Sequence, residues 1–328
     1  NLYQISCQKE QPLMLTNLFF IFCGLALLLG GGTLLIPGTI GLARRFNIPA
    51  RIVAFVIVAG GTSAPELLVS VNAVLQDSPG IAWGNVLGSN LANNMLVLGL
   101  GALAAPIITS DSVTRWDLKF LLFISLFIFA ILALGIYAGS AGIAVSLILI
   151  GSYLLYLLRM LRVQQGEPEI DEIPEKRSWK TALFYSFGGI AALIFGAELF
   201  VNGGIALARL SGWSEAFIGL TIIAIGTSLP EIVSVGASIL HKRGDIALGN
   251  VMGSNLFNLL IALGGAGLFG SLVIDIELVL LPMMLVVLVS VMLLIFSYRE
   301  KPISARWGVV FIGFYLCFLG LESMMSAA

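Results

Sequence analysis

The sequence GGTSAPE, at residues 60–66, lies inside an apolar stretch that runs from about residue 52 to residue 75. A charged residue at the centre of a membrane helix costs roughly 2.5–3.5 kcal/mol even on lenient insertion scales. The proline before the glutamate has no backbone N–H and disturbs the preceding helical turn. Both features in one membrane-length segment indicate a functional site rather than a simple anchor.

The composition is that of a membrane protein. Hydrophobic residues make up 59% of the 328 residues and charged residues 11%, against about 25% charged residues in soluble domains. Runs of about 20 apolar residues indicate helices that span a bilayer. The sequence therefore predicts an all-α, polytopic membrane protein with ten spans. They are placed at 13–36, 48–76, 81–106, 118–138, 141–161, 181–208, 214–240, 245–271, 277–297 and 304–325.

The basic residues predict the orientation of these spans, because cytoplasmic loops collect Lys and Arg. If the N-terminus is outside, all 17 basic residues except Lys9 and Arg209 fall at cytoplasmic ends or loops. We therefore expect a multi-pass protein of the cell membrane with both termini extracytoplasmic. Residues 1–12 are then an external, polar lead-in.

The opening motif occurs twice. IGTSLPE at 225–231 follows it after 165 residues, and GNVMGSNLFN at 249–258 follows GNVLGSNLAN at 84–93 with the same offset. Between residues 57–99 and 222–264, 20 of 43 aligned positions are identical. The chain therefore contains an internal duplication.

The duplication predicts two halves, residues 13–163 and 179–328, joined by a solvated cytoplasmic linker at 164–178. Each half has five predicted spans, an odd number, so the second half enters the membrane from the opposite side. Inverted repeats of this kind are typical of secondary transporters, whose ion sites lie near the midplane at broken helices.

The repeated motif gathers oxygen atoms. Thr62 and Ser63 precede Glu66 by four and three residues, so the hydroxyls and the carboxylate share one helical face. Pro65 has no N–H to donate to the carbonyl of Gly61. The second half repeats this arrangement with Thr227, Ser228, Pro230 and Glu231.

The helix after each motif carries a polar stripe with a spacing of four residues, which keeps its members on one face. The stripes consist of Asn85, Ser89 and Asn93 in the first half and Asn250, Ser254 and Asn258 in the second. Such residues also hold membrane helices together by hydrogen bonds. Because a glutamate accompanies both stripes, we favour a role in ion binding.

Carboxylate, hydroxyl and amide oxygens, with no sulfur or imidazole, predict a site for hard cations, Ca²⁺ above all. Two carboxylates balance one Ca²⁺ or two Na⁺. Because both ions use the same oxygens, they compete for the site. Either ion neutralises its two negative charges, and the neutral site can then become accessible from the other side of the membrane. This predicts antiport of Ca²⁺ against Na⁺ without a cofactor. Protons also neutralise carboxylates, so H⁺/Ca²⁺ antiport is the alternative.

Other polar residues carry less information. Cys7, Cys23 and Cys317 lie far apart and His241 lies in a loop, so neither a disulfide framework nor a zinc site is expected. Glu198 lies within a span and serves either an entry path or a position near water, and we favour the second.

Two other classes were considered. An intramembrane enzyme is disfavoured because the spans contain no nucleophile–base pair. A channel would differ from an antiporter because its ion flux would need no counter-ion. The sequence shows no basic cluster for nucleic acid and no sign of an obligate protein partner. The expected partners are the lipid bilayer, Ca²⁺, Na⁺ and, in the alternative, H⁺.

Ten spans, inverted halves and two motifs of the form GTSxPE…GNxxGSNxxN resemble the cation/calcium antiporter superfamily, specifically its prokaryotic sodium/calcium exchangers, over essentially the whole chain. The resemblance implies that Glu66 and Glu231 form a central pair that ligates Ca²⁺ and shares Na⁺. It also implies that hydroxyl or backbone oxygens of the motif and stripe residues, and two alanine carbonyls, are ligands. These further ligands are Ala59, Thr62, Ser63 and Ser89 in the first half and Ala224, Thr227, Ser228 and Ser254 in the second.

The resemblance has one departure. Asn93 and Asn258 match a central position that is Asp in some members, including potassium-dependent ones. Two asparagines at this position argue against co-transport of K⁺. The resemblance further implies that the first and sixth spans slide past the remaining helices to alternate access.

Overall fold

The computed structural model describes residues 2–109, 111–135, 139–163, 178–210, 226, 228–273 and 276–326. These residues are helical apart from loops and one isolated β-bridge between Ile107 and Ile303. The long helices are α1 (Leu2–Phe46), α7 (Ser112–Ala133), α8 (Gly139–Val163), α9 (Trp179–Leu210), α15 (Glu277–Tyr298) and α16 (Ala305–Ser326). The repeated motifs form shorter pieces.

These pieces include three π-helical segments, labelled η. In the first half they are α2 (Ala50–Val53), η1 (Ala54–Val58), α3 (Ala59–Thr62), α4 (Ala64–Leu75), α5 (Pro79–Leu91), η2 (Ala92–Val97) and α6 (Leu98–Ala104). In the second half they are α12 (Leu229–Leu240), α13 (Gly244–Phe257), η4 (Asn258–Ala262) and α14 (Leu263–Phe269).

The structure confirms an all-helical, polytopic membrane protein. Within the described residues, eight helical segments are long and apolar enough to cross a bilayer. A ninth is obtained if α2–α3 and α4, which meet at a bend of 44°, are one span. The predicted span 214–240 is described mainly by α12, and its earlier part lies outside the described residues, as do residues 164–177 of the predicted linker. Residues 2–12 of the predicted lead-in belong to helix α1.

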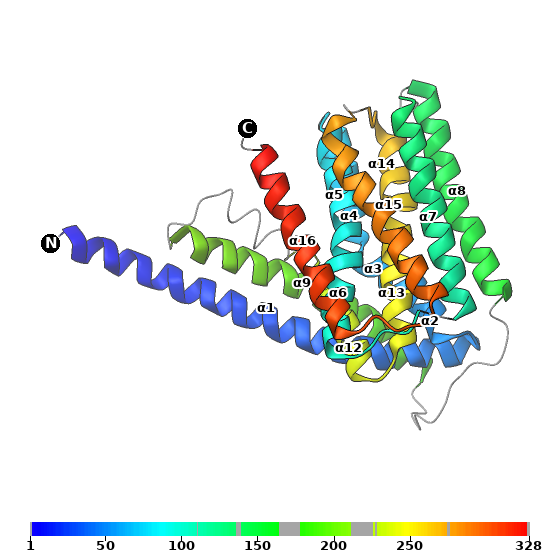
Figure 1. Ribbon diagram of the computed structural model, residues 1–328. Coiled ribbons are helices and arrows are strands. Elements are labelled where there is room, and N and C mark those ends of the chain that lie inside the picture. The colour runs from blue at the N-terminus through cyan, green and yellow to red at the C-terminus, as the bar shows by residue number, and fades with distance from the viewer. Residues whose placement is uncertain are drawn as a thin grey trace.

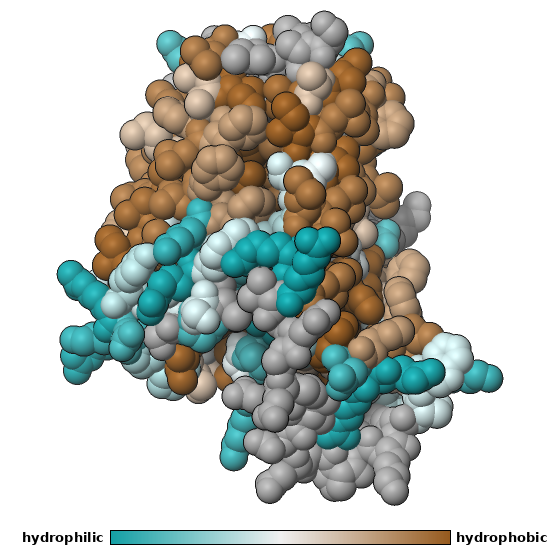
Figure 2. Space-filling model, turned by 90° about the vertical axis from the view of Figure 1, so that its right-hand side faces the viewer, coloured by the Kyte–Doolittle hydropathy of each residue, from teal (hydrophilic) through white to brown (hydrophobic). Residues whose placement is uncertain are grey.

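Two duplicated segments form the centre of the bundle. In the most apolar window of Pro79–Ala104, 78% of residues are buried, and in that of Gly244–Phe269, 89%, against 22–44% for the other long spans. The outer helices α7, α8, α15 and α16 surround them (Figure 1). Broad apolar surface covers the upper part of the molecule, and hydrophilic residues gather lower down (Figure 2).

Helices α1 and α9 lie side by side and run antiparallel at an angle to this bundle (Figure 1). Their contact passes through glycines. A Cβ built on Gly24 would lie 2.7 Å from the carbonyl oxygen of Gly196, and one on Gly31 would lie 2.8 Å from that of Gly189. The offset of 165 residues maps Gly24 onto Gly189 and Gly31 onto Gly196. The two contacts are therefore exchanged by a two-fold relation between the halves, as an inverted duplication requires.

A buried ion pair fixes the start of the first motif span. Arg51 is 7% exposed; its guanidinium lies 3.1 Å from Asp111 and 2.5 Å from Asp117. It donates to Thr114, and Tyr156 donates to Asp117. Burial disfavours ionisation of Asp111, but the Arg51 charge and hydrogen bonds from Thr114 hold the pKa of that carboxyl below its ordinary value of 3.8. The Arg51–Asp111 pair is therefore ionised at neutral pH, and the contacts of Arg51 and Tyr156 with Asp117 join α2 and α8 to α7.

The glycine contact predicts different responses at two neighbouring positions. Gly31→Ala places a Cβ against the Gly189 backbone, whereas a Cβ on Gly30 meets nothing within 4 Å. We expect Gly31→Ala to lower the free energy of unfolding by about 1–3 kcal/mol, as overpacking does, and Gly30→Ala to cause no loss. Thermal unfolding of both variants in one detergent measures this. Equal melting temperatures would show that the close approach does not limit the packing of α1 on α9.

Candidate functional site

In both motifs a serine with non-helical backbone angles precedes the helix that carries the glutamate. Ser63 separates α3 from α4 and Ser228 precedes α12, and their backbone angles agree closely, with φ −93° and ψ 6° against φ −92° and ψ 4°. In each half the proline stands in the first turn of the following helix, where its missing N–H is tolerated. The glutamate comes directly after the proline, so each motif presents one carboxylate at a helix start.

The two glutamates belong to one site. Glu66 is 5% exposed and Glu231 is 2% exposed, and the two carboxylates are close enough to interact electrostatically. The Ser63 hydroxyl donates across the halves to Oε1 of Glu231 at 3.4 Å. Oε2 of each glutamate is buried without a hydrogen-bond partner among the described residues. Two buried carboxylates with unused oxygens form the polar centre of an otherwise apolar interior.

Further oxygens of the first half lie beside them. The Thr62 hydroxyl donates to the carbonyl of Ala59 at 3.3 Å, and Ser89 of α5 adjoins the Glu66 carboxylate. Asn93 is 2% exposed and lies in the π-helical segment η2. Such π-helical segments occur frequently at functional sites.

The second half contributes buried polar atoms that lack protein partners. Ser254 and Asn258 are fully buried, and the Ser254 hydroxyl and both amide atoms of Asn258 have no hydrogen bond within the described chain. Buried polar groups are nearly always paired. The Ser254 hydroxyl oxygen and the Asn258 side-chain oxygen are therefore available to a hard cation, which binds oxygen. Ala224 and Thr227 lie outside the described residues.

Two asparagines of the polar stripes hold the motif backbones. Asn85 donates to the carbonyl of Glu66 and to the Ser70 hydroxyl, both at 2.9 Å. Its twin Asn250 donates to the Ser234 hydroxyl at 2.5 Å, and that hydroxyl donates to the carbonyl of Glu231 at 3.1 Å. The first half thus fixes its glutamate directly and the second half through a relay.

Some residues of this region were not identified from the sequence. Ser70 and Ser234 stand four and three residues after their glutamates, so they do not align in the repeat and give no shared signal. Asn90 and Asn255 do align. Asn90 donates to the carbonyl of Asn255, and Asn255 donates to Asn94, which joins the central helices of the two halves.

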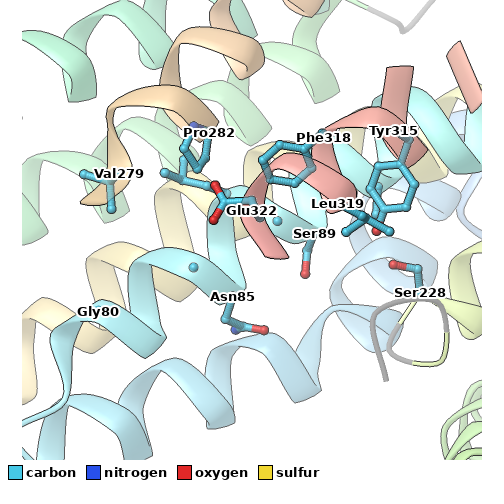
Figure 3. A pocket seen from close by; sticks show the side chains of 14 residues that line it. Gly80, Asn85, Ser89, Ser228, Val279, Pro282, Tyr315, Phe318, Leu319 and Glu322 are labelled. Carbon is cyan, nitrogen blue, oxygen red and sulfur yellow. The ribbon is translucent and has the colours of Figure 1, made fainter. Parts of the chain in front are cut away.

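A cavity of about 490 Å³ reaches the site (Figure 3). Its lining includes Ser89 from the first half and Ser228 from the second, together with Asn85. Residues of α15 and α16 close its other sides. The structure therefore brings serines of both motif regions to one space. Glu198, by contrast, is exposed on α9.

The fold and the site define a membrane transporter made of two duplicated halves. A sequence model of the sodium/calcium exchanger protein family matches the chain twice, at residues 16–162 and 181–324. The chain therefore belongs to the sodium/calcium exchanger family.

Individual relatives agree with this assignment. The chain is 35% identical to the putative antiporter CaxA of Alkalimonas amylolytica over 80% of this chain and 83% of that protein. It is 28% identical to the sodium/calcium exchanger MaX1 of Methanosarcina acetivorans over 92% and 97%. A structure of the sodium-calcium exchanger NCX_Mj superposes with a TM-score of 0.79 at 31% identity, over 94% of this chain and 99% of that one. The protein is thus a cation/Ca²⁺ exchanger of the NCX_Mj type and not an enzyme.

The relay through Ser234 generates a prediction. Ser234→Ala leaves the buried amide of Asn250 without its acceptor, and an unsatisfied buried polar group costs about 1–3 kcal/mol. Ser238→Ala is the matched control, because among the described residues the Ser238 hydroxyl bonds to a carbonyl of its own helix and to no other group. We expect denaturant unfolding to show the larger loss for Ser234→Ala. Equal losses in the two variants would contradict a positioning role for Ser234.

Proposed function

We propose that the protein exchanges Ca²⁺ for Na⁺ across the cell membrane by alternating access at the site of Glu66 and Glu231. The observation that carries this proposal is the hydrogen bond from Ser63 to Glu231. It joins the broken helix of one half to the carboxylate of the other, beside Glu66. A cation held there contacts both halves at once.

The proposed ligands are oxygens alone. The glutamates supply the charge, and hydroxyl, amide and carbonyl oxygens complete the shell, as hard cations require. The first half contributes Ala59, Thr62, Ser63, Glu66, Ser89 and Asn93. The second contributes Ser228, Glu231, Ser254 and Asn258, with Ala224 and Thr227 added on the strength of the repeat.

Charge explains why transport is coupled. Two ionised carboxylates in an apolar interior are strongly destabilised unless cations accompany them. One Ca²⁺ or two Na⁺ neutralise the pair, whereas the bare site carries two negative charges. The loaded forms therefore change sides and the empty form does not, which makes the transporter an antiporter.

The cavity supports access from one side of the membrane. It runs from the ends of the helices, where Gly80 and Val279 lie, down to Ser89 and Ser228. The distribution of the basic residues favours an extracytoplasmic position for these helix ends and for both termini. In this scheme α1 and α9 move as a pair against the bundle to open the opposite side.

Sodium is favoured over protons as the counter-ion. A proton on a carboxylate needs no further ligand, whereas the surrounding hydroxyls and amides suit a metal cation. MaX1 is a sodium/calcium exchanger by name, while a more distant relative, the Ca²⁺/H⁺ antiporter ChaA of Bacillus subtilis, is 27% identical over 59% of this chain. Proton exchange is therefore the competing outcome of the test. Two asparagines at 93 and 258 lead us to expect no dependence on K⁺.

Ca²⁺ uptake into proteoliposomes tests the proposal. With the pH clamped and K⁺ varied separately, an outward Na⁺ gradient should drive Ca²⁺ uptake. Uptake that follows a pH gradient and ignores Na⁺ would replace the sodium proposal by H⁺/Ca²⁺ antiport. Ca²⁺ uptake that depends on neither a Na⁺ gradient nor a pH gradient would indicate a channel.

Neutralising either glutamate tests the shared site. We expect Glu66→Gln and Glu231→Gln each to lower the Ca²⁺ exchange rate at least about a hundredfold, because a missing carboxylate removes a charge-assisted ligand. Glu198→Gln is the matched control, since the same change falls on an exposed residue of a membrane helix, and it should retain exchange. Near-normal transport by either motif variant would refute a site shared by the two glutamates.

A further inference from the structure

A third carboxylate lies on the route to the site. Glu322 lines the cavity near the C-terminal end of α16, on the same helical face as Tyr315, Phe318 and Leu319 (Figure 3). These positions follow the spacing of one α-helical face. Leu321, the residue before Glu322, is 51% exposed and belongs to the outer surface of the helix. The carboxylate is thus turned toward the cavity rather than toward lipid.

Glu322 stands at the outer end of this cavity. It lies near Val279 and Pro282 of α15, whereas Ser228 lies at the other end and Ser89 lies between Glu322 and Ser228 (Figure 3). Asn85, which like Ser89 belongs to α5, also lines the cavity. Its amide N–H groups are used on Glu66 and Ser70, so its carbonyl oxygen remains an acceptor. The cavity is therefore lined by a carboxylate, an amide oxygen and serine hydroxyls.

Among the residues that the structure describes, no basic side chain pairs with this carboxylate. Within the part of the chain that the structure describes, no hydrogen bond or ion pair involves Glu322. Acidic residues in membrane segments are costly and mark ion pathways or pairs. A cation in the cavity is the counter-charge that fits its position.

This residue has no counterpart in the first half. The offset of 165 residues maps Glu322 of α16 onto Leu157 of α8. The central glutamates, by contrast, are duplicated. The duplication therefore provides no equivalent carboxylate in the first half, and we expect an effect of Glu322 on one side of the membrane only.

We propose that Glu322 is an outer capture site for hard cations, which concentrates Ca²⁺ more than Na⁺ at the mouth of the cavity on the side of the C-terminus. This proposal rests on the proposed function, because it needs a transported cation. The negative charge multiplies the local concentration of a monovalent ion by a Boltzmann factor. For a divalent ion the factor is squared, since the electrostatic energy doubles.

Transport kinetics on each face test this inference. Right-side-out and inverted membrane vesicles are compared at low ionic strength, and removal of a C-terminal tag by external protease reports the sidedness. In Glu322→Gln we expect the half-saturating concentration on the C-terminal side to rise about twofold for Na⁺ and about fourfold for Ca²⁺. Both shifts should shrink in high concentrations of a non-transported salt, which screens the charge. The constants on the opposite side should stay unchanged.

Two variants serve as controls. Glu322→Asp keeps the charge and should restore both constants. Glu300→Gln removes the same charge from an exposed residue just before α16, at the opposite end of that helix from Glu322, and should alter neither constant on the C-terminal side.

The outcomes separate this inference from the proposed function. Absence of Ca²⁺ exchange in the wild-type protein would overturn the proposed function and this inference with it. Normal wild-type exchange with unchanged constants in Glu322→Gln would overturn the capture site alone. An equal loss of maximal rate on both sides, independent of ion charge and salt, would show that Glu322 is merely structural.

Discussion

Two carboxylates buried in an apolar bundle are the constraint on which the rest of the structure depends. Their burial requires polar partners, and in each half the helix that carries the glutamate begins at a serine three residues earlier. Ser63 then reaches across to Glu231, and the central helices α5 and α13 present serines and asparagines instead of leucines. The outer helices keep lipid away from these groups, so the most buried spans are the ones that carry the polar residues of the site.

The halves are alike in plan but differ in detail. Asn85 bonds the Glu66 backbone directly, whereas Asn250 acts through the Ser234 hydroxyl. The buried ion pair of Arg51 anchors the first motif span to α7 and α8. The two halves therefore differ in the hydrogen bonds and the ion pair that hold their motif helices. A duplicated transporter works in one membrane with unlike solutions on its two sides.

Much of this arrangement could be predicted from the sequence, because the duplication preserves register. The constant offset identified both glutamates, their serines and the polar stripes, and hydropathy identified the membrane spans. Ser70 and Ser234 were not predicted as partners of the site, because they are displaced by one position relative to each other in the repeat. Glu322 was not predicted to line the cavity, because it has no equivalent in the first half and follows an ordinary apolar run. Whether a side chain faces a cavity or lipid depends on neighbours distant in the sequence, and one chain alone does not reveal them.

The glycine contacts between α1 and α9 form an isologous interface inside a single chain. Gly24 meets Gly196 and Gly31 meets Gly189, and the duplication exchanges the two contacts. In a two-fold homodimer one substitution alters both equivalent contacts. Here each glycine is encoded separately, so a substitution alters one contact and leaves its equivalent intact. The fusion of the halves therefore lets the two ends of this helix pair be tuned independently.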